Sequence, residues 1–342
     1  MNYEEIIKTD YKILESLPEN EVFDVVTEII SHYRKSGFPY FPIDKEKIKK
    51  EHDSLLKTDV EKMLVDGNNI QQGMVGLNTC NTFHPSMFST KCRNAKSPME
   101  IFSDDKLFRT ALTKRIKYND RNLNDGCVRR TLTAFGGQAV SNFRPSVAKF
   151  IYQKYCPPNG KVLDPCAGYG GRLMGAFCSH VSSYTGIDPS SNSFNGNTNL
   201  YNALSEVSPS KKFNFKLEKI PFEDYVAGDD EFDLVFTSPP YFNVEKYSEE
   251  KTQSYIRHEN YDDWVSNFLT ILIENSWKFL KAGGYLVLNV GNPIVEDTLR
   301  IGTMVFKNEP ETYYMRLSKF LGKGNKSNIK HKLEPIFIWK KV

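Results

Sequence analysis

The chain has 342 residues, 39% of them hydrophobic, and a formal net charge of only +3. This length and composition are sufficient for two domains with hydrophobic cores. No apolar run reaches the roughly 18 residues of a membrane span, and the acidic N-terminal sequence differs from a secretory signal, so we expect no membrane association and a place in the cytoplasm, or inside the host cell if the source is viral.

The first 137 residues are predicted to form a mainly helical N-terminal region. Apolar residues recur at helical spacing in 4–34 and 44–65, and the Gly- and Pro-containing stretch 37–42 separates these segments. The stretch 78–102 is polar, basic and aromatic, which favours an irregular recognition surface. Its basic residues are candidate contacts to nucleic acid: Lys91, Arg93 and Lys96.

A helix is predicted over 142–152, where a proline, Pro145, precedes apolar residues at helical spacing. The stretch 161–173 then indicates a short strand, a glycine-rich turn and the start of another helix. Gly168 and Gly170 in the turn permit positive φ angles and a close approach of the backbone to a ligand. The helix N-terminus behind them supplies N–H groups and positive potential.

A second strand is predicted over 183–190, with Asp188 near its carboxyl end. An open α/β sheet holds a carboxylate for ribose hydroxyls at this position, so Asp188 is our predicted ribose ligand. An ordinary surface acid in a turn is the alternative. The next predicted strand, 213–217, alternates aromatic and polar residues and leads into the acidic stretch 221–224.

The most informative stretch follows the predicted strand 232–236 and reads Thr-Ser-Pro-Pro-Tyr-Phe from Thr237 to Phe242. Two consecutive prolines fix φ and remove two backbone donors, so the chain leaves the sheet with its carbonyl groups free. A hydroxyl, two prolines and an aromatic ring at the carboxyl end of a strand form a slot that suits a planar group carrying an NH2. Prolines also end strands for purely structural reasons, and that alternative stays open.

The remaining elements complete a sheet. An amphipathic helix is predicted over 261–280, with Gly283 in its stop signal, and a central strand over 285–292. The pair 312–318 and 334–339 is typical of a terminal antiparallel hairpin.

Positive charge is concentrated in two blocks, although the net charge is small. Residues 79–130 carry eleven Lys and Arg against five acids, and residues 307–342 carry nine against three. Two basic blocks beside a nearly neutral core favour phosphate binding, whereas solvated charged faces are the alternative. The second block contributes four candidate phosphate contacts: Lys323, Lys326, Lys330 and Lys332.

The six cysteines include no Cys-x-x-Cys pair, which argues against a zinc ribbon or a disulfide framework. Cys80, His84, Cys92 and Cys127 could in principle meet as a zinc site, but reduced cysteines in core or loop positions are favoured. We therefore predict no metal.

Together these segments resemble the DNA amino-methyltransferases, which methylate an exocyclic nitrogen of adenine or cytosine. Ser238 to Tyr241 fits the family's catalytic pattern, (Asp, Asn or Ser)-Pro-Pro-(Tyr, Phe or Trp), at every position. The turn after Asp164 resembles the family's S-adenosylmethionine loop, Asp-Pro-Phe-x-Gly-x-Gly, with Cys166 in place of the Phe. The resemblance covers roughly 138–342.

The resemblance implies an α/β fold of the Rossmann-like methyltransferase type, with a mixed seven-stranded sheet and helices on both faces. The catalytic domain would be 138–342, and the region 1–137 would recognise the target, because little of the catalytic domain is left for that role. The helix that starts at Pro145 would cover the methionine end of the cofactor.

The resemblance also implies the site residues. The catalytic residues would be Ser238, Pro239, Pro240 and Tyr241. The cofactor-binding residues would be Phe143, Arg144, Pro145, Asp164, Cys166, Ala167, Gly168, Gly170, Asp188, Pro189, Phe222, Glu223 and Thr237.

The implied function is site-specific transfer of a methyl group from S-adenosylmethionine to the exocyclic amino group of a flipped base in duplex DNA. Ser at the first motif position favours N4 of cytosine over N6 of adenine. A restriction-modification partner would fit this role, and the oligomeric state stays open. The alternatives are an RNA or protein methyltransferase of the related Asn/Asp-Pro-Pro-Tyr type and a catalytically inactive nucleic-acid-binding protein.

Overall fold

The computed structural model describes residues 1–118, 122–135, 137–228, 231–317 and 332–342. These residues divide into two compact units. Unit 1 consists of Met1–Pro42, Pro85–Ser141 and Glu245–Tyr247, and unit 2 consists of Ile43–His84, Asn142–Val244 and Ser248–Val342.

This division differs from a single boundary at residue 137, because the stretch Ile43–His84 clusters with the catalytic motifs in unit 2. Lys149 explains part of the difference. Its buried ammonium donates to three backbone carbonyls of the stretch, those of Leu55, Leu56 and Thr58, at 2.8, 2.8 and 3.0 Å. These bonds satisfy the last carbonyls of a helix that the sequence places in the N-terminal region.

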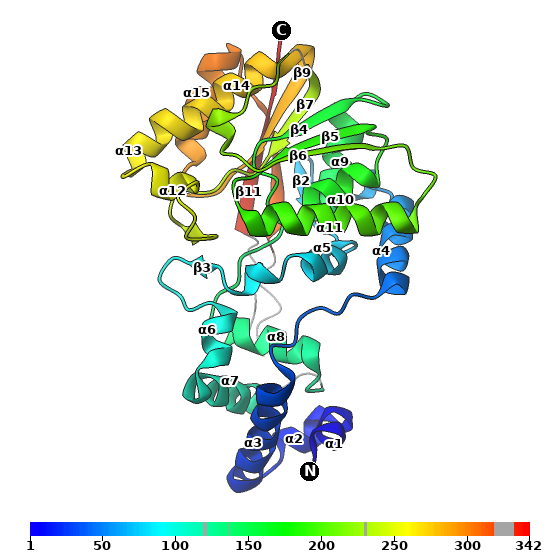
Figure 1. The fold of residues 1–342 in the computed structure, drawn as a ribbon, viewed down its shortest axis with the longest axis vertical. Coiled ribbons are helices and arrows are strands. Elements are labelled where there is room, and N and C mark those ends of the chain that lie inside the picture. Colours follow the sequence, from blue (N-terminus) through cyan, green and yellow to red (C-terminus); the bar gives the residue numbers. More distant parts are fainter. Residues whose placement is uncertain (119–121, 136, 229–230, 318–331) are drawn as a thin grey trace. The chain divides into compact units, whose positions relative to one another are not determined.

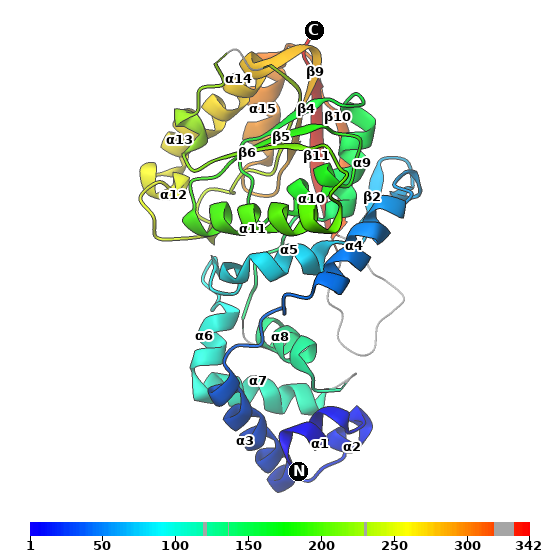
Figure 2. The same ribbon diagram turned by 45° about the vertical axis from the view of Figure 1, so that its right-hand side comes forward.

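Unit 1 is mainly helical, as Figures 1 and 2 show. Its helices are α1 (Tyr3–Lys8), α2 (Tyr11–Glu15), α3 (Glu19–Ser36), α6 (Pro98–Ser103), α7 (Asp105–Lys117) and α8 (Asp125–Ala134). The predicted helical stretch 4–34 is thus broken into three, because Asp10 caps α2 with its side chain and Pro18 precedes α3. Stacked and edge-on rings, such as Phe38 against Phe102 at 5.2 Å, fill the space around α3 and α6.

A two-stranded ladder also belongs to unit 1. Strand β3 (Lys91–Cys92) pairs antiparallel with β8 (Glu245–Lys246). Since β8 follows the Ser-Pro-Pro-Tyr motif in sequence, the chain leaves unit 2 after Val244 and returns at Ser248.

Unit 2 is built on one mixed sheet, in which the described residues form nine strands. The strands are β1 (Leu64–Val65), β2 (Asn69–Gln71), β4 (Lys161–Asp164), β5 (Ser183–Ile187), β6 (Asn214–Glu218), β7 (Phe232–Thr237), β9 (Leu280–Asn289), β10 (Glu311–Leu317) and β11 (Lys332–Lys340). Their order across the sheet is β1-β2-β10-β11-β9-β7-β4-β5-β6. The strands from β9 to β6 are parallel, and β11 runs antiparallel to β9.

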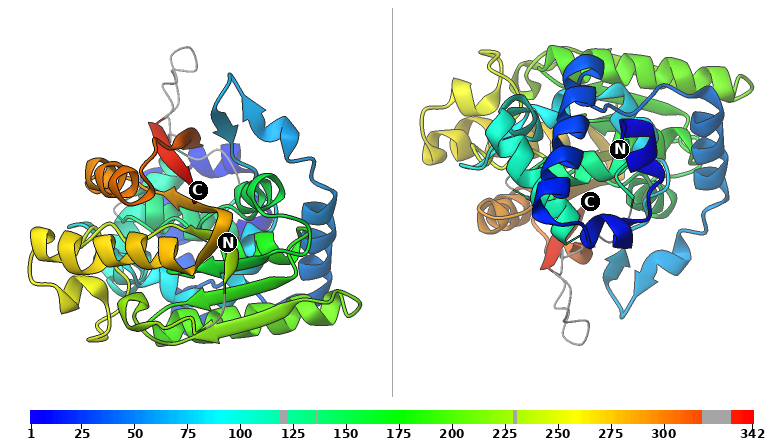
Figure 3. Two further views of the ribbon diagram at one scale, coloured as in Figure 1. Left: turned by 90° about the horizontal axis from the view of Figure 1, so that it is seen from above. Right: turned by 90° about the horizontal axis from the view of Figure 1, so that it is seen from below.

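Helices cover both faces of this sheet. One face carries α9 (Pro145–Tyr155), α10 (Gly171–Phe177) and α11 (Ser191–Val207), and the other carries α13 (Tyr261–Trp264), α14 (Thr270–Phe279) and α15 (Val295–Phe306). In the view from above, yellow α14 and green α11 lie on opposite sides of the strands (Figure 3). Residues of one strand alternate between the two cores: Leu234 and Phe236 enter the first, and Val235 the second.

The remaining short elements of unit 2 are the helices α4 (Lys45–Lys57), α5 (Leu77–Phe83) and α12 (Ser254–Arg257), the 3₁₀ turns Glu61–Met63 and Phe222–Asp224, and the π-helical turn Val265–Leu269 between α13 and α14. Within the described residues, no helix is long and apolar enough to cross a membrane.

The strand order confirms the predicted Rossmann-like methyltransferase fold with helices on both faces of a mixed sheet. The seven strands β10, β11, β9, β7, β4, β5 and β6 fall on predicted segments, although β9 begins at Leu280 and the prediction began at 285. The sheet has two more strands than predicted, because β2 pairs parallel with β10 and β1 pairs with β2. These two strands span only two and three residues, too few for a period-2 pattern to mark them.

Candidate functional site

The glycine-rich turn follows β4 at the carboxyl edge of the sheet. Gly168 and Gly170 have φ angles of 57° and 79°, in the left-handed region that glycine tolerates best. A Cβ atom at residue 170 would lie 2.5 Å from the side chain of Leu200, so this position excludes larger residues. A Cβ at residue 168 would meet nothing closer than 3.7 Å, so the backbone at Gly168 is open to a ligand.

Asp188, at the end of β5, is bonded to this turn. Its Oδ2 accepts a hydrogen bond from the N–H of Gly168 at 2.8 Å, and its Oδ1 accepts one from the N–H of Ser190 at 2.9 Å. Burial raises the pKa of Asp188 to about 6, against the opposing effect of these two donors. A buried carboxylate held in this way retains lone pairs for further donors, such as the hydroxyls of a sugar.

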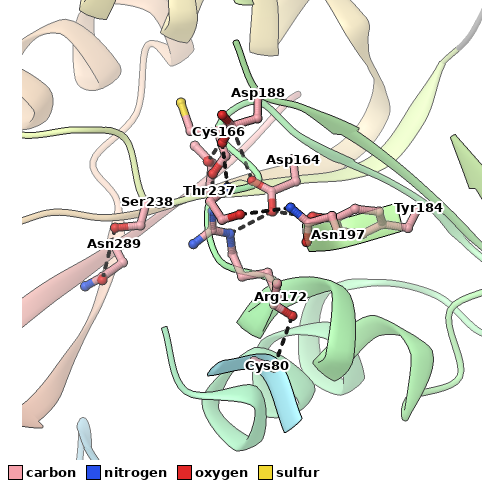
Figure 4. Close-up of polar contacts among 12 residues, drawn as sticks. Cys80, Asp164, Cys166, Arg172, Tyr184, Asp188, Asn197, Thr237, Ser238 and Asn289 are labelled. Carbon is pink, nitrogen blue, oxygen red and sulfur yellow. Dashed lines mark hydrogen bonds and ion pairs between the residues drawn. The ribbon is translucent and has the colours of Figure 1, made fainter. Parts of the chain in front are cut away.

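Asp164, predicted as a cofactor residue, is bonded to side chains of the protein itself (Figure 4). Its Oδ2 forms an ion pair with Nε of Arg172 at 2.8 Å and accepts the hydroxyl of Tyr184 at 2.6 Å. Arg172 also donates to the carbonyl of Cys166, which fixes the turn. Burial would lower the pKa of Arg172, but the Asp164 charge raises it, so the guanidinium stays charged. The sequence analysis did not select Arg172, although a charged residue in the apolar helix α10 was the available signal.

Thr237 joins the glycine turn to the Ser-Pro-Pro-Tyr motif. It is fully buried at the end of β7, and its Oγ1 accepts the N–H of Cys166 at 3.1 Å. Because β4 and β7 are parallel neighbours, their carboxyl ends meet at one edge of the sheet. The turn and the motif are therefore adjacent in space, as Figure 4 shows around Thr237.

The hydroxyl of Ser238 donates to Oδ1 of Asn289 at 3.5 Å, a long hydrogen bond. Asn289 is the last residue of β9, and its Nδ2 donates to the carbonyl of Pro335 at 3.2 Å. That second bond fixes the amide with its oxygen toward Ser238. Asn289 was missed by the sequence analysis, and its signal would have been a polar residue at the carboxyl end of the strand beside β7.

The two prolines differ in exposure, with Pro239 buried and Pro240 half-buried, and Tyr241 is half-buried as well. The ring of Tyr241 lies against Gly291, where an added Cβ would be 2.8 Å from Cε2 of the ring. Phe242 has a φ of 57°, which a non-glycine residue seldom adopts, so the backbone is strained directly after the motif.

The three predicted residues before β4 have different surroundings. Phe143 packs edge-on against Phe236 at 5.4 Å and lies under the guanidinium of Arg172 at 5.5 Å. Arg144 donates through Nε to Oε1 of Gln72 at 2.8 Å, and burial lowers its pKa. Pro145 is the first residue of α9. Phe143 thus borders the glycine turn, whereas the guanidinium of Arg144 is bonded to Gln72, the residue after β2.

The predicted residues after β4, β5 and β6 are buried or half-buried. Ala167 is buried beneath the turn, where its N–H donates to the carbonyl of Ile187, and Pro189 is half-buried beside Asp188. Phe222 is 2% exposed and packs in the core near Tyr225. The side chain of Glu223 is 6% exposed.

Helix α5 supports the glycine turn from outside. His84, directly after α5, is fully buried, and its Nδ1 donates to the carbonyl of Cys80 at 2.8 Å. Asn142 donates to the carbonyl of Tyr169 in the turn at 2.8 Å. Burial lowers the pKa of His84 to about 4, so the ring is neutral at pH 7. Neither residue was selected as part of the cofactor site from sequence.

The candidate nucleic-acid residues of unit 1 are exposed. Lys91 forms an ion pair with Glu100 at 3.3 Å, and Arg93 has a φ of 52° in the turn after β3. Lys96 is exposed next to the capping residue Ser97. Of the second basic block, Lys332 is exposed at the start of β11. The other three, Lys323, Lys326 and Lys330, lie outside the described residues.

The four residues considered for zinc do not form one cluster. Cys80 and His84 belong to unit 2, and Cys92 and Cys127 belong to unit 1. In the described part of the chain, no group of three or more His, Cys, Asp and Glu side chains could hold a metal ion.

Comparison with known proteins shows two kinds of similarity. Residues 232–342 match a family model described as DNA methylase. No curated protein matches the chain significantly. The match begins at β7 and includes Ser238, Tyr241 and Asn289.

Three of the solved structures to which this chain is similar are described as methyltransferases. A methyltransferase from Pyrococcus furiosus has 14% identity and a TM-score of 0.34, with 58% of this chain and 82% of that chain covered. A tRNA (m1A58) methyltransferase from Aquifex aeolicus has 12% identity and a TM-score of 0.39, covering 59% and 70%. A SAM-dependent O-methyltransferase from Thermotoga maritima has 12% identity and a TM-score of 0.39, covering 59% and 67%.

The family match supports methyltransferase activity and the predicted cofactor, S-adenosylmethionine. The strand order and the glycine turn beside β7 agree with it. The protein is an S-adenosylmethionine-dependent methyltransferase whose residues 232–342 match the DNA methylase family.

Proposed function

We propose that this protein transfers a methyl group to an exocyclic amino group of a DNA base, with N4 of cytosine favoured over N6 of adenine. One observation carries the proposal: the Ser-Pro-Pro-Tyr motif follows Thr237, whose Oγ1 is bonded to the glycine turn at Cys166. A base in the motif's slot and a cofactor on the turn would therefore meet at neighbouring strand ends. The DNA methylase match over this segment supports the same reaction.

The residues of unit 2 fit S-adenosylmethionine. The open backbone at Gly168 suits close approach, and Asp188 has a carboxylate suited to ribose hydroxyls. Glu223 adds a buried acceptor, since neither of its carboxylate oxygens has a hydrogen-bond partner among the described residues. When bound, the cofactor supplies an electrophilic methyl group on a sulfonium.

Ser238 and Pro239 would orient the amino group of the base. Because the Ser238 hydroxyl directs its proton to Asn289, its lone pairs are available to accept one amino hydrogen. The Pro239 carbonyl would accept the other. Two acceptors draw the nitrogen toward tetrahedral geometry, so its lone pair becomes available for attack, and no covalent nucleophile is required.

Tyr241 would stack on the base. Its ring is held against the backbone of Gly291, which gives it a defined orientation. Stacking on an aromatic ring is worth about 1–3 kcal/mol per base, comparable to the few kcal/mol needed to take a base out of a duplex. Contacts from exposed lysines to the phosphate backbone would supply the remaining affinity.

Recognition of the target would belong to unit 1, where Lys91, Arg93 and Lys96 are exposed on and after β3. The preference for cytosine rests on Ser238 alone, because Ser at this motif position favours cytosine in the family that the chain resembles. A cognate restriction nuclease would fit a site-specific enzyme of this kind.

The test is methyl transfer from isotopically labelled S-adenosylmethionine to duplex DNA and to RNA, followed by analysis of the nucleosides. We expect N4-methylcytosine in the DNA. N6-methyladenine would change the assigned base and keep the reaction class. Label found only in RNA or in protein would overturn the proposal, and cofactor binding without any transfer would indicate an inactive nucleic-acid-binding protein.

A further inference from the structure

The ladder of β3 and β8 has one buried and one exposed face. Its two residue pairs are Lys91 opposite Lys246 and Cys92 opposite Glu245. Directly opposite residues point to the same side of a ladder, and successive residues point to opposite sides. Cys92 is 1% exposed and Glu245 is half-buried, whereas both lysines are exposed. Lys91 and Lys246 therefore share the exposed face.

Two like charges at directly opposite positions destabilise a ladder. This ladder has only two residue pairs, so few backbone hydrogen bonds offset the repulsion. Nζ of Lys91 lies 3.3 Å from Oε1 of Glu100, but the Lys91 side chain is 55% exposed, and exposed ion pairs stabilise little. Within the part of the chain that the structure describes, Lys246 has no ion pair. The exposed face thus carries positive charge that is only partly compensated.

A phosphodiester group is complementary to this face. Its two non-bridging oxygens share one negative charge, and each oxygen can accept a hydrogen bond from one ammonium group. The Cβ atoms of directly opposite residues are roughly 4.5–5.5 Å apart. Two flexible lysine side chains at that spacing can converge on one phosphate. Binding there would replace a repulsion across the ladder by two attractions.

A single turn joins β8 to the Ser-Pro-Pro-Tyr motif. The N–H of Val244 donates to the carbonyl of Tyr241 at 3.3 Å, and β8 begins at the next residue. Within this turn the ring of Phe242 packs against those of Tyr261 and Trp264, with centroids at 5.8 and 6.0 Å. The link between Tyr241 and β8 is therefore short and tightly folded, so the position of the ladder limits the positions open to Tyr241.

The chain is held again directly after β8. The hydroxyl of Ser248 donates to Oε2 of Glu250 at 2.9 Å, and Oε1 of Glu250 accepts the hydroxyl of Ser191 at 2.6 Å. Residues 245–247 are the only described part of the matched segment 232–342 that belongs to unit 1. Through β8, the segment with the catalytic motif thus takes part in the unit that carries the predicted DNA contacts of β3.

We propose that one phosphodiester group of the DNA backbone binds across Lys91 and Lys246, and that this contact fixes the ring of Tyr241 for stacking on the target base. Without a phosphate, repulsion between the two lysines weakens the ladder, and the turn before β8 is less firmly held. Lys246 is a positioning residue, which acts on the base through Tyr241. The inference rests on the proposed function and adds a residue that lies outside both basic blocks.

The first experiment counts the phosphates. The double variant Lys91→Gln, Lys246→Gln should lower the slope of log affinity against log salt on duplex DNA by about 1, the value for one shared phosphate. A decrease of about 2, as for two separate phosphates, or an unchanged slope would overturn the proposal. The control is Lys161→Gln, at an exposed position where β4 begins, on the edge of the sheet away from the motif; its slope should equal that of the unchanged protein.

The second experiment locates the phosphate. A methylphosphonate group has no charge, and it can replace each phosphate in turn around the methylated base. We expect one position at which this replacement weakens binding by the unchanged protein about fivefold or more but leaves binding by Lys246→Gln nearly unaltered. If every replacement weakens both proteins equally, no phosphate binds at Lys246.

The third experiment separates positioning from simple attraction. At DNA concentrations that saturate each protein, Lys246→Gln should transfer the methyl group about tenfold more slowly in a single turnover, because the base is less well placed. Lys246→Arg keeps the charge and should restore the rate. In a Tyr241→Ala background, Lys246→Gln should cost almost nothing further, because the ring that it positions is absent. An equal loss with and without the ring, or a loss confined to affinity, would overturn the link to Tyr241.

Failure of the proposed function has a different result. If the unchanged protein methylates no DNA, both proposals fall. If it methylates DNA and the variants at Lys91 and Lys246 behave like Lys161→Gln, only the phosphate site falls.

Discussion

The imidazole of His84 occupies the space that a side chain at residue 196 would need: a Cβ added to Gly196 would lie 2.5 Å from Nε2 of His84. His84 also faces Gly170, where an added Cβ would be 2.9 Å from Cε1. Two glycines from different elements thus make room for one buried ring beside the cofactor turn.

This relationship predicts a rescue. Gly196→Ala should destabilise the protein by about 1–3 kcal/mol, because overpacking forces neighbouring groups to move. Combining it with His84→Ala should recover part of that loss, since the methyl group then enters the vacated space. Urea unfolding of the two single variants and the double variant measures the coupling. Strict additivity of the two losses would contradict the proposed contact.

Two buried groups predict opposing effects of pH on stability in the absence of cofactor. The pKa of His84 is lowered to about 4 by burial, so its contribution is present above pH 6.5 and is lost as pH falls toward 4. The pKa of Asp188 is raised to about 6, chiefly by burial, so its contribution is present below pH 3.8 and is lost as pH rises through 6.

We therefore compare the unfolding free energy of each variant with that of the unchanged protein at the same pH. For His84→Gln this difference should be more favourable to the variant at pH 4 than at pH 7. For Asp188→Asn it should be more favourable to the variant at pH 7 than at pH 4. Each change should be up to about 3 kcal/mol. Unfolding free energies measured across this range provide the check, and parallel curves for all three proteins would refute it.

Asp188 should also control cofactor affinity. Asp188→Ala removes a charge-assisted bond to the ribose and should weaken binding by about 1.5–3 kcal/mol. Because only the ionised carboxylate accepts both hydroxyls, affinity in the unchanged protein should decrease as pH falls below about 6. Calorimetry at several pH values tests both statements, with Glu249→Ala as an exposed acidic control. Unaltered affinity in Asp188→Ala would remove the ribose assignment.

Ser238 and Asn289 should act as a pair in turnover. Ser238→Ala removes an acceptor for the amino group and should lower turnover much more than cofactor affinity. Asn289→Ala leaves the Ser238 hydroxyl as an acceptor but removes the group that orients its proton, so turnover should fall less. The double variant should be no slower than Ser238→Ala. Independent effects of the two changes in a single-turnover assay would speak against the pair.

Tyr241 gives a separate prediction for base binding. Tyr241→Ala should lose about 1–3 kcal/mol of DNA affinity through lost stacking. Gly291→Ala should produce a similar loss by displacing the ring, since the new methyl group would lie 2.8 Å from Cε2. Cofactor affinity serves as the internal control and should not change. If both variants turn over like the unchanged protein, the base binds elsewhere.

The basic blocks should differ in what they contribute. Neutralising Lys323, Lys326, Lys330 and Lys332 removes up to four phosphate contacts, so the slope of log affinity against log salt should decrease by up to ~4 on duplex DNA. Replacing the basic residues of unit 1 (Lys91, Arg93 and Lys96) should instead collapse the ratio of methylation at the preferred site to methylation elsewhere. A uniform loss from both sets would leave the recognition role of residues 1–137 without support.

The sheet was predictable because its central strands are short apolar runs that end in turn signals. β4, β5 and β7 start within a residue of their predicted positions, and α10 follows the glycine-rich turn as predicted. The helix α11 was not predicted, because its sequence is rich in Asn and Ser. β9 begins earlier than predicted, at Leu280, because pairing with β7 extends the strand through the glycines that end the preceding helix.

The polar network of the site was less predictable. Asp164 was recognisable as a motif residue, but its partners Arg172 and Tyr184 are brought to it only by the packing of α10 and β5. Asn289 is more than fifty residues from Ser238 along the chain, and only the neighbouring strand positions join them. Contacts of this kind depend on strand register, which a single sequence does not specify.

Unit 2 is assembled from separate segments of the chain, and this determines which fragments can fold. A piece that starts at residue 138, as the sequence motifs recommend, would lack α4, α5, β1 and β2. It would remove the fully buried side chains of Ile70 and Cys80 from the core and would deprive the Lys149 ammonium of its three carbonyl acceptors. A catalytic fragment that folds alone must therefore keep residues 43–84. Replacing residues 85–141 by a short linker between His84 and Asn142 would keep them, whereas truncation from the N-terminus would not.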